Sequence, residues 1–303
     1  MSMTLSAAPA SARTAYGRVR AYVALTKPRI IELLLVTTVP TMIVAARGLP
    51  SGWLILATLV GGTLAAGGAN AINMYVDRDI DRIMRRTRNR PLVTGAVTPR
   101  AALVFALALE VAAFVELWLA VNLLSALLAI GATLFYVFVY TLWLKRTSTQ
   151  NIVIGGAAGA VPVLVGWASV TDRLALAPVL LFAVIFLWTP PHFWALAVRY
   201  REDYAAAEVP MLPVVKPLVS AARQITAYTV VMWGVSLAFG AVAHMGPLYW
   251  VAAVVLGGFF TAKAVRLQLS RSAELAMSLF GFSITYLTLL FAAMAADQLL
   301  RHL

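Results

Sequence analysis

Long apolar stretches separated by short polar segments run the length of this chain. Nine of them are long enough to cross the hydrocarbon core of a bilayer, which takes about 20 residues of α-helix. They cover residues 30–47, 53–75, 101–120, 122–143, 151–170, 175–197, 223–243, 247–267 and 276–299. The pattern predicts an all-α polytopic membrane protein with nine transmembrane helices.

The distribution of basic residues supports this number of helices. Lys and Arg concentrate on the cytoplasmic side of membrane proteins. Of the 24 Lys and Arg residues, all except Arg47, Arg173 and Arg301 fall in the N-terminal segment or in every second segment after it. We therefore expect a cytoplasmic N-terminus, with residues 1–28 as a basic tail and residues 29–303 as a single transmembrane domain.

Two of the predicted cytoplasmic loops are long and contain acidic as well as basic residues. They comprise residues 76–100 and 198–222, and four predicted helices lie between them. Internal repeats with equivalent loops are common in membrane proteins that hold a substrate between two halves. We expect two four-helix halves plus a ninth helix, with the two loops facing each other.

Composition excludes the soluble classes of protein. Hydrophobic residues make up 62% of the 303 residues, charged residues make up 12%, and the mean hydropathy is +0.87. A soluble domain could not bury so much apolar side chain. The chain has no cysteine, which excludes thiolate metal sites, so a metal would need oxygen or imidazole ligands. The net charge of +12 is explained by topology and anionic headgroups, and we expect no nucleic-acid partner.

The N-terminal segment bears on the membrane in which the protein resides. It has no apolar core before Ile30 and so does not resemble a cleaved signal peptide. Its composition is similar to that of a mitochondrial transit peptide, but a short basic tail is also typical of bacterial inner-membrane proteins. We favour the bacterial inner membrane and keep the mitochondrial inner membrane as the alternative.

An amide and two carboxylates follow one another at the inner end of the second stretch. Asn73, Asp77 and Asp81 are four residues apart, which in a helix places them on one face with about 6 Å of rise between neighbours. Oxygen ligands of this kind suit Mg²⁺, which is often shared between carboxylates and substrate phosphates. The alternative is ordinary pairing of the acids with arginines three or four residues further along the helix.

An arginine-rich segment follows these acids. Residues 85–92 are Arg-Arg-Thr-Arg-Asn-Arg-Pro-Leu. So many guanidinium groups beside carboxylates indicate a polyanion between them, and the arginine fork matches phosphate oxygens. We therefore expect Arg85, Arg86 and Arg90 to bind a diphosphate, while part of this charge also anchors the loop on the cytoplasmic side.

The second long loop supplies a further acid. Asp203 and Tyr204 precede a Val-Pro-Met-Leu-Pro turn at residues 209–213, whose prolines would end a helix rather than extend it. If the two halves face each other, Asp203 lies opposite Asp77 and Asp81 and can help to hold Mg²⁺. In isolation it would be an ordinary solvated loop acid.

Several motifs together resemble one known family. They are Asn73-x3-Asp77-x3-Asp81, Tyr140-Thr-Leu-Trp-Leu-Lys-Arg146, Asn151-Ile-Val-Ile-Gly-Gly-Ala-Ala-Gly159, Trp188-Thr-Pro-Pro-His-Phe-Trp194 and Pro210-Met-Leu-Pro213. From about Thr26 to the last stretch, the chain resembles the UbiA intramembrane prenyltransferase superfamily, and within it the haem-farnesylating branch. Glu208 departs from the pattern, because a small or amide residue is expected before the proline turn, and it puts the shape of that turn in doubt.

The resemblance implies a reaction and a set of site residues. The donor would be farnesyl diphosphate and the acceptor haem B, and a hydroxyl from water would remain on the new side chain of haem O. Mg²⁺ would be held by Asn73, Asp77, Asp81 and Asp203, and the diphosphate by Arg85, Arg86, Arg90, Lys145 and Arg146. The lipid bilayer surrounds the site, and a haem A synthase or a terminal oxidase assembly would receive the product.

Four residues are expected to contact the acceptor: His192, Tyr140, Trp194 and Tyr204. His192 would ligate the haem iron or contact a propionate. A hydrogen bond from this histidine to a backbone carbonyl freed by Pro190 or Pro191 is the structural alternative. Aromatic residues near helix ends also form belts at the level of the headgroups.

Two other functions fit part of the pattern. A prenyltransferase of the same superfamily could act on a quinone precursor, but the segment from Trp188 to Trp194 and the proline turn favour haem. A transporter also contains buried acids and helices interrupted by proline. Its carboxylates should lie near the middle of the membrane, whereas Asp77, Asp81 and Asp203 are expected at the cytoplasmic edge.

Overall fold

The described part of the protein is entirely helical. The computed structural model describes residues 14–270 and 272–301, and these form no β-strand. The helices are α1 (Ala15–Thr26), α2 (Pro28–Ala46), α3 (Gly52–Val76), α4 (Arg78–Ile83), α5 (Pro91–Thr94), α6 (Pro99–Ala120), α7 (Leu123–Leu134), the π-helix η2 (Phe135–Leu144), α8 (Lys145–Thr147), α9 (Asn151–Thr171), α10 (Leu176–Arg199), α11 (Arg201–Ala206), α12 (Leu212–Val215), α13 (Leu218–Val242), α14 (Pro247–Ser270) and α15 (Ala273–Leu300).

Eight helices in the described ranges are long and apolar enough to cross a membrane. They are α3, α6, the continuous segment Leu123–Thr147, α9, α10, α13, α14 and α15. These confirm a polytopic all-α protein and match eight of the predicted stretches. The 19-residue helix α2 covers the remaining stretch, with Val36–Ala46 as its described apolar part. A ninth span and a cytoplasmic N-terminus stay predictions.

The helices begin and end where backbone groups find local partners. Ser51 accepts a hydrogen bond from Leu54 N at the start of α3, and Thr98 accepts one from Ala101 N at the start of α6. Such caps satisfy amide groups that a helix leaves free in its first turn. Lys27 adopts a left-handed conformation, with φ of 53°, and separates α1 from α2 ahead of Pro28. Residues 15–26, within the predicted tail, pack on the bundle through the fully buried Leu25.

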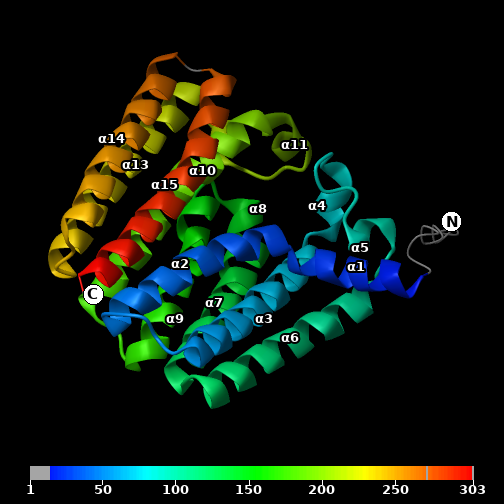
Figure 1. Ribbon diagram of the computed structural model, residues 1–303. Helices are drawn as coiled ribbons and strands as arrows, with labels where there is room; N and C mark the ends of the chain where they lie inside the picture. Colours follow the sequence, from blue (N-terminus) through cyan, green and yellow to red (C-terminus); the bar gives the residue numbers. More distant parts are fainter. Residues whose placement is uncertain (1–13, 271, 302–303) are drawn as a thin grey trace, which may run out of the picture.

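Helices pack within each predicted half and also between the halves, where α9 contacts α2 and α7. In the first half α3 packs against α6 and α7, and in the second half α10 packs against α9 and α13 (Figure 1). The last helix, α15, packs against α14 and α10 and also against α2 at the other end of the chain. The first and the last long helices therefore lie in contact with each other.

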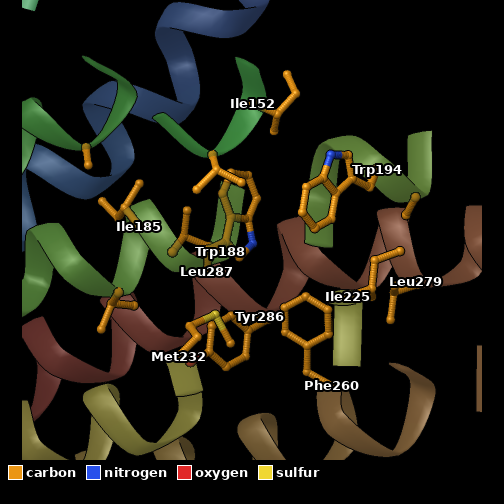
Figure 2. Close-up of a cluster of buried hydrophobic side chains, with 14 of the residues drawn as sticks. Ile152, Ile185, Trp188, Trp194, Ile225, Met232, Phe260, Leu279, Tyr286 and Leu287 are labelled. Carbon is orange, nitrogen blue, oxygen red and sulfur yellow. The ribbon is translucent and has the colours of Figure 1, made fainter. Parts of the chain in front are cut away.

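The largest hydrophobic cluster among the described residues lies mainly between α10, α13, α14 and α15 (Figure 2). Trp188 of α10, Ile225 of α13 and Tyr286 of α15 belong to it, and Trp188 Nε1 donates to the carbonyl oxygen of Ser283 at 2.8 Å. In the first half, α3 approaches α6 closely at Gly68, where an added Cβ would lie 2.5 Å from Glu110 Oε1. Small residues of this kind let membrane helices pack tightly.

Several of the short helices gather at one end of the bundle. In Figure 1, α1, α4, α5 and α11 lie at the end remote from the C-terminus. Arg86, just after α4, donates to the hydroxyl of Tyr204 on α11 at 3.4 Å. The two long loops predicted to face each other are therefore in contact, which places the candidate chemistry at this end.

Candidate active site

Three polar side chains line the end of α3 and the start of α4. The backbone stays helical across Asp77, since its N–H bonds to Asn73 O and the N–H of Asp81 bonds to Asp77 O, both at 2.9 Å. Asn73, Asp77 and Asp81 therefore share one face, as predicted. They are 3%, 0% and 2% exposed, and Asn73 Nδ2 donates to Asp77 Oδ2 at 2.7 Å.

Cations from distant segments pair with these acids. Lys145 donates to Asp77 Oδ2, and one nitrogen of Arg90 donates to both oxygens of Asp81, at 2.8 and 2.7 Å. Lys27 Nζ donates to Asn73 Oδ1 at 2.8 Å. The short-range pairing considered as an alternative is wrong for Asp81, because its partner is nine residues away on the returning loop. We call these residues, with Thr141 below, the acid–base cluster.

The edge of the cluster carries a second pairing. Arg146 donates to both oxygens of the exposed Asp79, at 2.7 and 2.8 Å, and its Nη2 lies 3.6 Å from Asp77 Oδ1. The hydrogen bond from Arg146 holds the pKa of Asp79 well below its usual value. Asp79 therefore stays ionised and orients Arg146 beside the buried acid.

The surroundings of Lys27 disfavour its charged form. Desolvation lowers the pKa of Lys27 well below its usual value, and the positive charges of Arg90 and Lys145 lower it further, while Asp77 and Asp81 oppose this. Positive groups crowded together in a low dielectric repel each other. A polyanion bound beside them would relieve this repulsion.

A π-helix brings further residues to the cluster. The segment η2 covers ten residues, and π-helical turns are frequent at functional sites. Its Thr141 is fully buried and accepts a hydrogen bond from Asn73 Nδ2 at 3.2 Å. Its Tyr140 stacks on Tyr136, with ring centroids 5.3 Å apart, and lies against Gly155 of α9. Tyr140 is thus held next to the residue that orients Asn73.

The second loop reaches the first through Arg86. The guanidinium of Arg86 contacts the Tyr204 hydroxyl and lies 5.7 Å from the centre of the Tyr200 ring. Asp203 is partly exposed on α11, next to Tyr204. In the described ranges no group of three His, Cys, Asp or Glu side chains lies close enough to hold a metal. The structure thus brings Asp203 to the same end as Asp77 and Asp81 without joining all three.

The other predicted residues occupy different surroundings. Arg85 is exposed after α4. Trp194 is fully buried and packs edge-on against Tyr228 of α13, with ring centroids 5.6 Å apart. His192 bonds to the hydroxyl of Ser283 on α15 and not to a backbone carbonyl freed by the prolines, so that alternative is wrong. Tyr140 and Tyr204 lie near the acid–base cluster, whereas His192 and Trp194 lie further along α10.

Comparison with known proteins identifies the family. The model of the UbiA prenyltransferase family matches residues 34–293. The chain belongs to this family. A protoheme IX farnesyltransferase from Frankia alni is 58% identical over 281 residues, which cover 92% of this chain and 97% of that protein. A protein of the same name from Streptomyces avermitilis is 54% identical over 290 residues, covering 94% and 95%.

Solved structures share the fold of this UbiA-family chain. A digeranylgeranylglyceryl phosphate synthase superposes with a TM-score of 0.78 at 17% identity, covering 93% of this chain and 98% of the other. A UbiA homolog from Archaeoglobus fulgidus bound to GPP and Mg²⁺ has a TM-score of 0.64 at 16% identity, with 90% and 99% covered. At these identities the likeness shows the fold.

Two residues of the acid–base cluster were not expected from the sequence of this UbiA-family chain. Lys27 reaches Asn73 across 46 positions and Thr141 reaches it across 68. A lysine directly before a proline at the inner start of the first stretch was a usable signal for Lys27. For Thr141 the sequence carried no local signal, because its position depends on how η2 winds.

Proposed function

We propose that this chain transfers the farnesyl group of farnesyl diphosphate to a vinyl group of haem B, with addition of water, to give haem O and diphosphate. The acid–base cluster carries the proposal, because a fully buried Asp77 lies among Lys145, Lys27 and Arg90 at one end of an apolar bundle. Such opposed charges suit a metal-bound polyanion. Relatives more than half identical bear the name protoheme IX farnesyltransferase, which supports haem as the acceptor.

The chemistry of the proposed donor set suits a magnesium ion. Mg²⁺, held by Asn73, Asp77, Asp81 and Asp203, would neutralise the diphosphate and make it a better leaving group. Carboxylate and amide oxygens are the hard ligands that this ion prefers. In the described part of the chain, Asp77 Oδ1 is buried and has no hydrogen-bond partner, so one lone pair is free. The UbiA homolog bound to GPP and Mg²⁺ supports this choice of ion.

Basic residues would bind the diphosphate from the other side. The set is Arg85, Arg86, Arg90, Lys145 and Arg146. Arg90 and Lys145 contact the acids directly, and both side chains would be free to turn toward phosphate oxygens if those acids held a metal. These cations then stabilise the charge that develops on the leaving diphosphate as an allylic cation forms.

The apolar bundle would protect that cation until the acceptor attacks. The aromatic rings of Tyr140 and Tyr204 lie near the cluster and can stabilise positive charge through their faces. His192 and Trp194 lie deeper along α10, and with the two tyrosines they are our candidates for contact with haem B. Because these helices are enclosed by other apolar helices, water is kept from the cation.

The wider setting follows from the same proposal. The protein would lie in a bacterial inner membrane, with residues 1–28 in the cytoplasm and residues 29–303 forming one catalytic domain of nine spans. Haem O would pass to a haem A synthase or to a terminal oxidase assembly. The acids lie at an end of the bundle and not at its middle, which argues against a transporter.

The proposed function is tested with the detergent-purified protein, Mg²⁺, farnesyl diphosphate and haem B. We expect mass spectrometry to detect haem O in the wild type and a loss of at least about a hundredfold in Asp77→Asn and Asp203→Asn. A chelator should stop turnover. Asp172→Asn is the matched control, because Asp172 is exposed on the connection between α9 and α10, and it should keep full activity.

The same assay can refute the assignment. Turnover of a quinone precursor without turnover of haem B would move the chain to another acceptor class. Full activity in Asp77→Asn or Asp203→Asn, in a protein that melts at the wild-type temperature, would remove that residue from the metal set.

A further inference from the structure

The side chain of His192 is a buried polar group in the membrane-spanning part of α10. It is 7% exposed and precedes the end of that helix by seven residues, which places it about 10 Å from the helix end. Ionisable side chains at such depth are costly in a membrane and usually have a function. The acid–base cluster does not use it.

Hydrogen bonding determines which nitrogen of His192 carries the proton. Nδ1 lies 2.6 Å from the hydroxyl oxygen of Ser283, and that hydroxyl donates to the carbonyl oxygen of Phe280, also at 2.6 Å. A serine hydroxyl has one proton to donate. Because Ser283 gives its proton to Phe280, it accepts from His192, so Nδ1 is protonated and Nε2 of the neutral ring keeps its lone pair.

Aromatic rings hold the imidazole in this orientation. Trp188 stacks on it with centroids 4.2 Å apart and planes at 20°, and Phe280 stacks on it at 4.5 Å and 29°. One face of an imidazole has no room for both rings, so they cover opposite faces. The Trp188 indole is itself fixed by the carbonyl oxygen of Ser283. Ser283 of α15 thus holds both Trp188 and His192 of α10 in position through hydrogen bonds.

The remaining edge of the ring is available to a ligand. Within the described ranges Nε2 of His192 has no hydrogen-bond partner, and protein atoms do not enclose it completely. Phe193 meets the imidazole edge-on, with centroids 5.0 Å apart, and is 37% exposed. The imidazole therefore borders an exposed apolar ring.

We propose that His192 binds the iron of haem B through Nε2 and that Ser283 is the positioning residue that fixes its tautomer and orientation. This deepens the proposed function and rests on haem being the acceptor. Metal-binding histidines usually donate their second N–H to an oxygen acceptor, which is the arrangement of His192 and Ser283. Imidazole is a common axial ligand of haem iron, and aromatic neighbours suit a porphyrin.

The test measures haem binding without farnesyl diphosphate. The purified protein is titrated with ferric haem B and followed by optical and electron paramagnetic resonance spectroscopy. We expect a histidine-ligated spectrum in the wild type and loss of that signature in His192→Gly, with affinity reduced about tenfold or more. Added imidazole should restore the signature in His192→Gly. His244→Gly is the control, because His244 is exposed at the far end of α13, and its spectrum should not change.

Ser283→Ala separates positioning from packing. We expect its haem affinity to fall about tenfold, with altered resonance signals, whereas Ser283→Thr should restore much of the wild-type behaviour. Ser236→Ala is the matched control, because Ser236 on α13 also bonds to the carbonyl three residues earlier, at 2.7 Å, without a histidine partner. It should bind haem as the wild type does.

The outcomes distinguish this inference from the proposed function. A wild-type haem spectrum in His192→Gly would overturn the inference even if haem O is formed. Histidine-ligated haem without any farnesyl transfer would refute the proposed reaction but would support the haem-binding site. If His192→Gly does not fold, the spectra of Ser283→Ala and Ser236→Ala decide, and identical spectra would overturn the inference.

Discussion

The carboxylate of Asp81 depends on a single guanidinium. One nitrogen of Arg90 contacts both of its oxygens, which leaves the other nitrogens of the fork for a phosphate. A lysine could replace that one contact but could not fork onto a second anion at the same time. The two tasks of Arg90 can therefore be separated by mutation.

For Arg90→Lys we expect a stable protein with a KM for farnesyl diphosphate raised about tenfold, which corresponds to ~1.4 kcal/mol. Arg90→Ala should lose both activity and thermal stability, because it leaves the buried Asp81 unpaired. Steady-state kinetics and thermal melting in detergent measure the two effects. Arg88→Lys, in the same exposed loop, is the control, and a similar rise in its KM would show a general charge effect instead.

At the scale of elements, the π-helix η2 packs closely against α9 because a glycine there leaves room for a tyrosine ring. A Cβ added at Gly155 would lie 2.2 Å from Cδ2 of Tyr140, while a Cβ at Gly159, one turn along α9, would meet nothing within 4 Å. Tyr140 precedes Thr141, which orients Asn73. A methyl group at Gly155 therefore acts on the acid–base cluster through η2.

We expect Gly155→Ala to lower kcat/KM about tenfold, because a displacement of about 1 Å at a catalytic centre has effects of this order or larger. Gly159→Ala should be close to wild type. Parallel kinetic assays of the two variants test this. Equal activities would show that the packing of Tyr140 does not matter to the cluster.

The start of α14 depends on an acid from α15. Asp297 is buried and accepts hydrogen bonds from the backbone N–H groups of Gly246, Leu248 and Tyr249, at 2.6, 3.1 and 3.3 Å. Carboxylates at helix N-termini satisfy free amides and interact favourably with the helix dipole. The contact joins two helices at the end of the bundle opposite the acid–base cluster.

For Asp297→Ala we expect a loss of about 1–3 kcal/mol in stability, since buried amide groups lose their acceptor. Asp297→Asn keeps one acceptor oxygen and should lose less. Thermal melting in detergent gives the comparison, with haem O formation below the melting temperature as the readout of an intact site. An alanine variant as stable as the asparagine variant would contradict the role of the cap.

At the scale of the molecule, the cluster couples two ligands. The acids that would bind a metal now pair with the cations that would bind a diphosphate. A metal bound to the acids would free the cations for the diphosphate, and a diphosphate bound to the cations would free the acids for the metal. The two binding free energies are therefore linked, and the linkage is reciprocal. We expect farnesyl diphosphate to tighten Mg²⁺ binding about tenfold or more, and Mg²⁺ to tighten diphosphate binding equally. Calorimetry with each ligand alone and in the presence of the other tests this, and independent binding would contradict it.

Hydrophobicity alone predicted most of the fold. The stretch expected at 53–75 is α3 over Gly52–Val76, and that at 151–170 is α9 over Asn151–Thr171. Lipid demands long uninterrupted apolar helices, so their pattern is plain in the sequence. The starts of α13 and α15 lie several residues before the predicted ones, because Ser220 and Arg223 interrupt the apolar pattern of α13 and Glu274 interrupts that of α15.

The site was only partly predictable for a different reason. The spacing of Asn73, Asp77 and Asp81 determines a shared helix face, which is local information. The contacts of Lys27, Thr141 and Ser283 depend on tertiary packing between segments far apart in the sequence. No propensity marks the ten residues of η2 as a π-helix, since that winding is set by its neighbours.

The packing of α15 against α10 has a consequence for biosynthesis. Ser283 and Phe280 belong to the final helix, so a chain still emerging from the ribosome lacks the groups that orient the imidazole of α10. Membrane helices insert in order as they are synthesised, and contacts between distant segments form late. Incomplete or truncated polypeptides would therefore be unable to sequester a redox-active porphyrin, and only finished molecules would acquire that capacity.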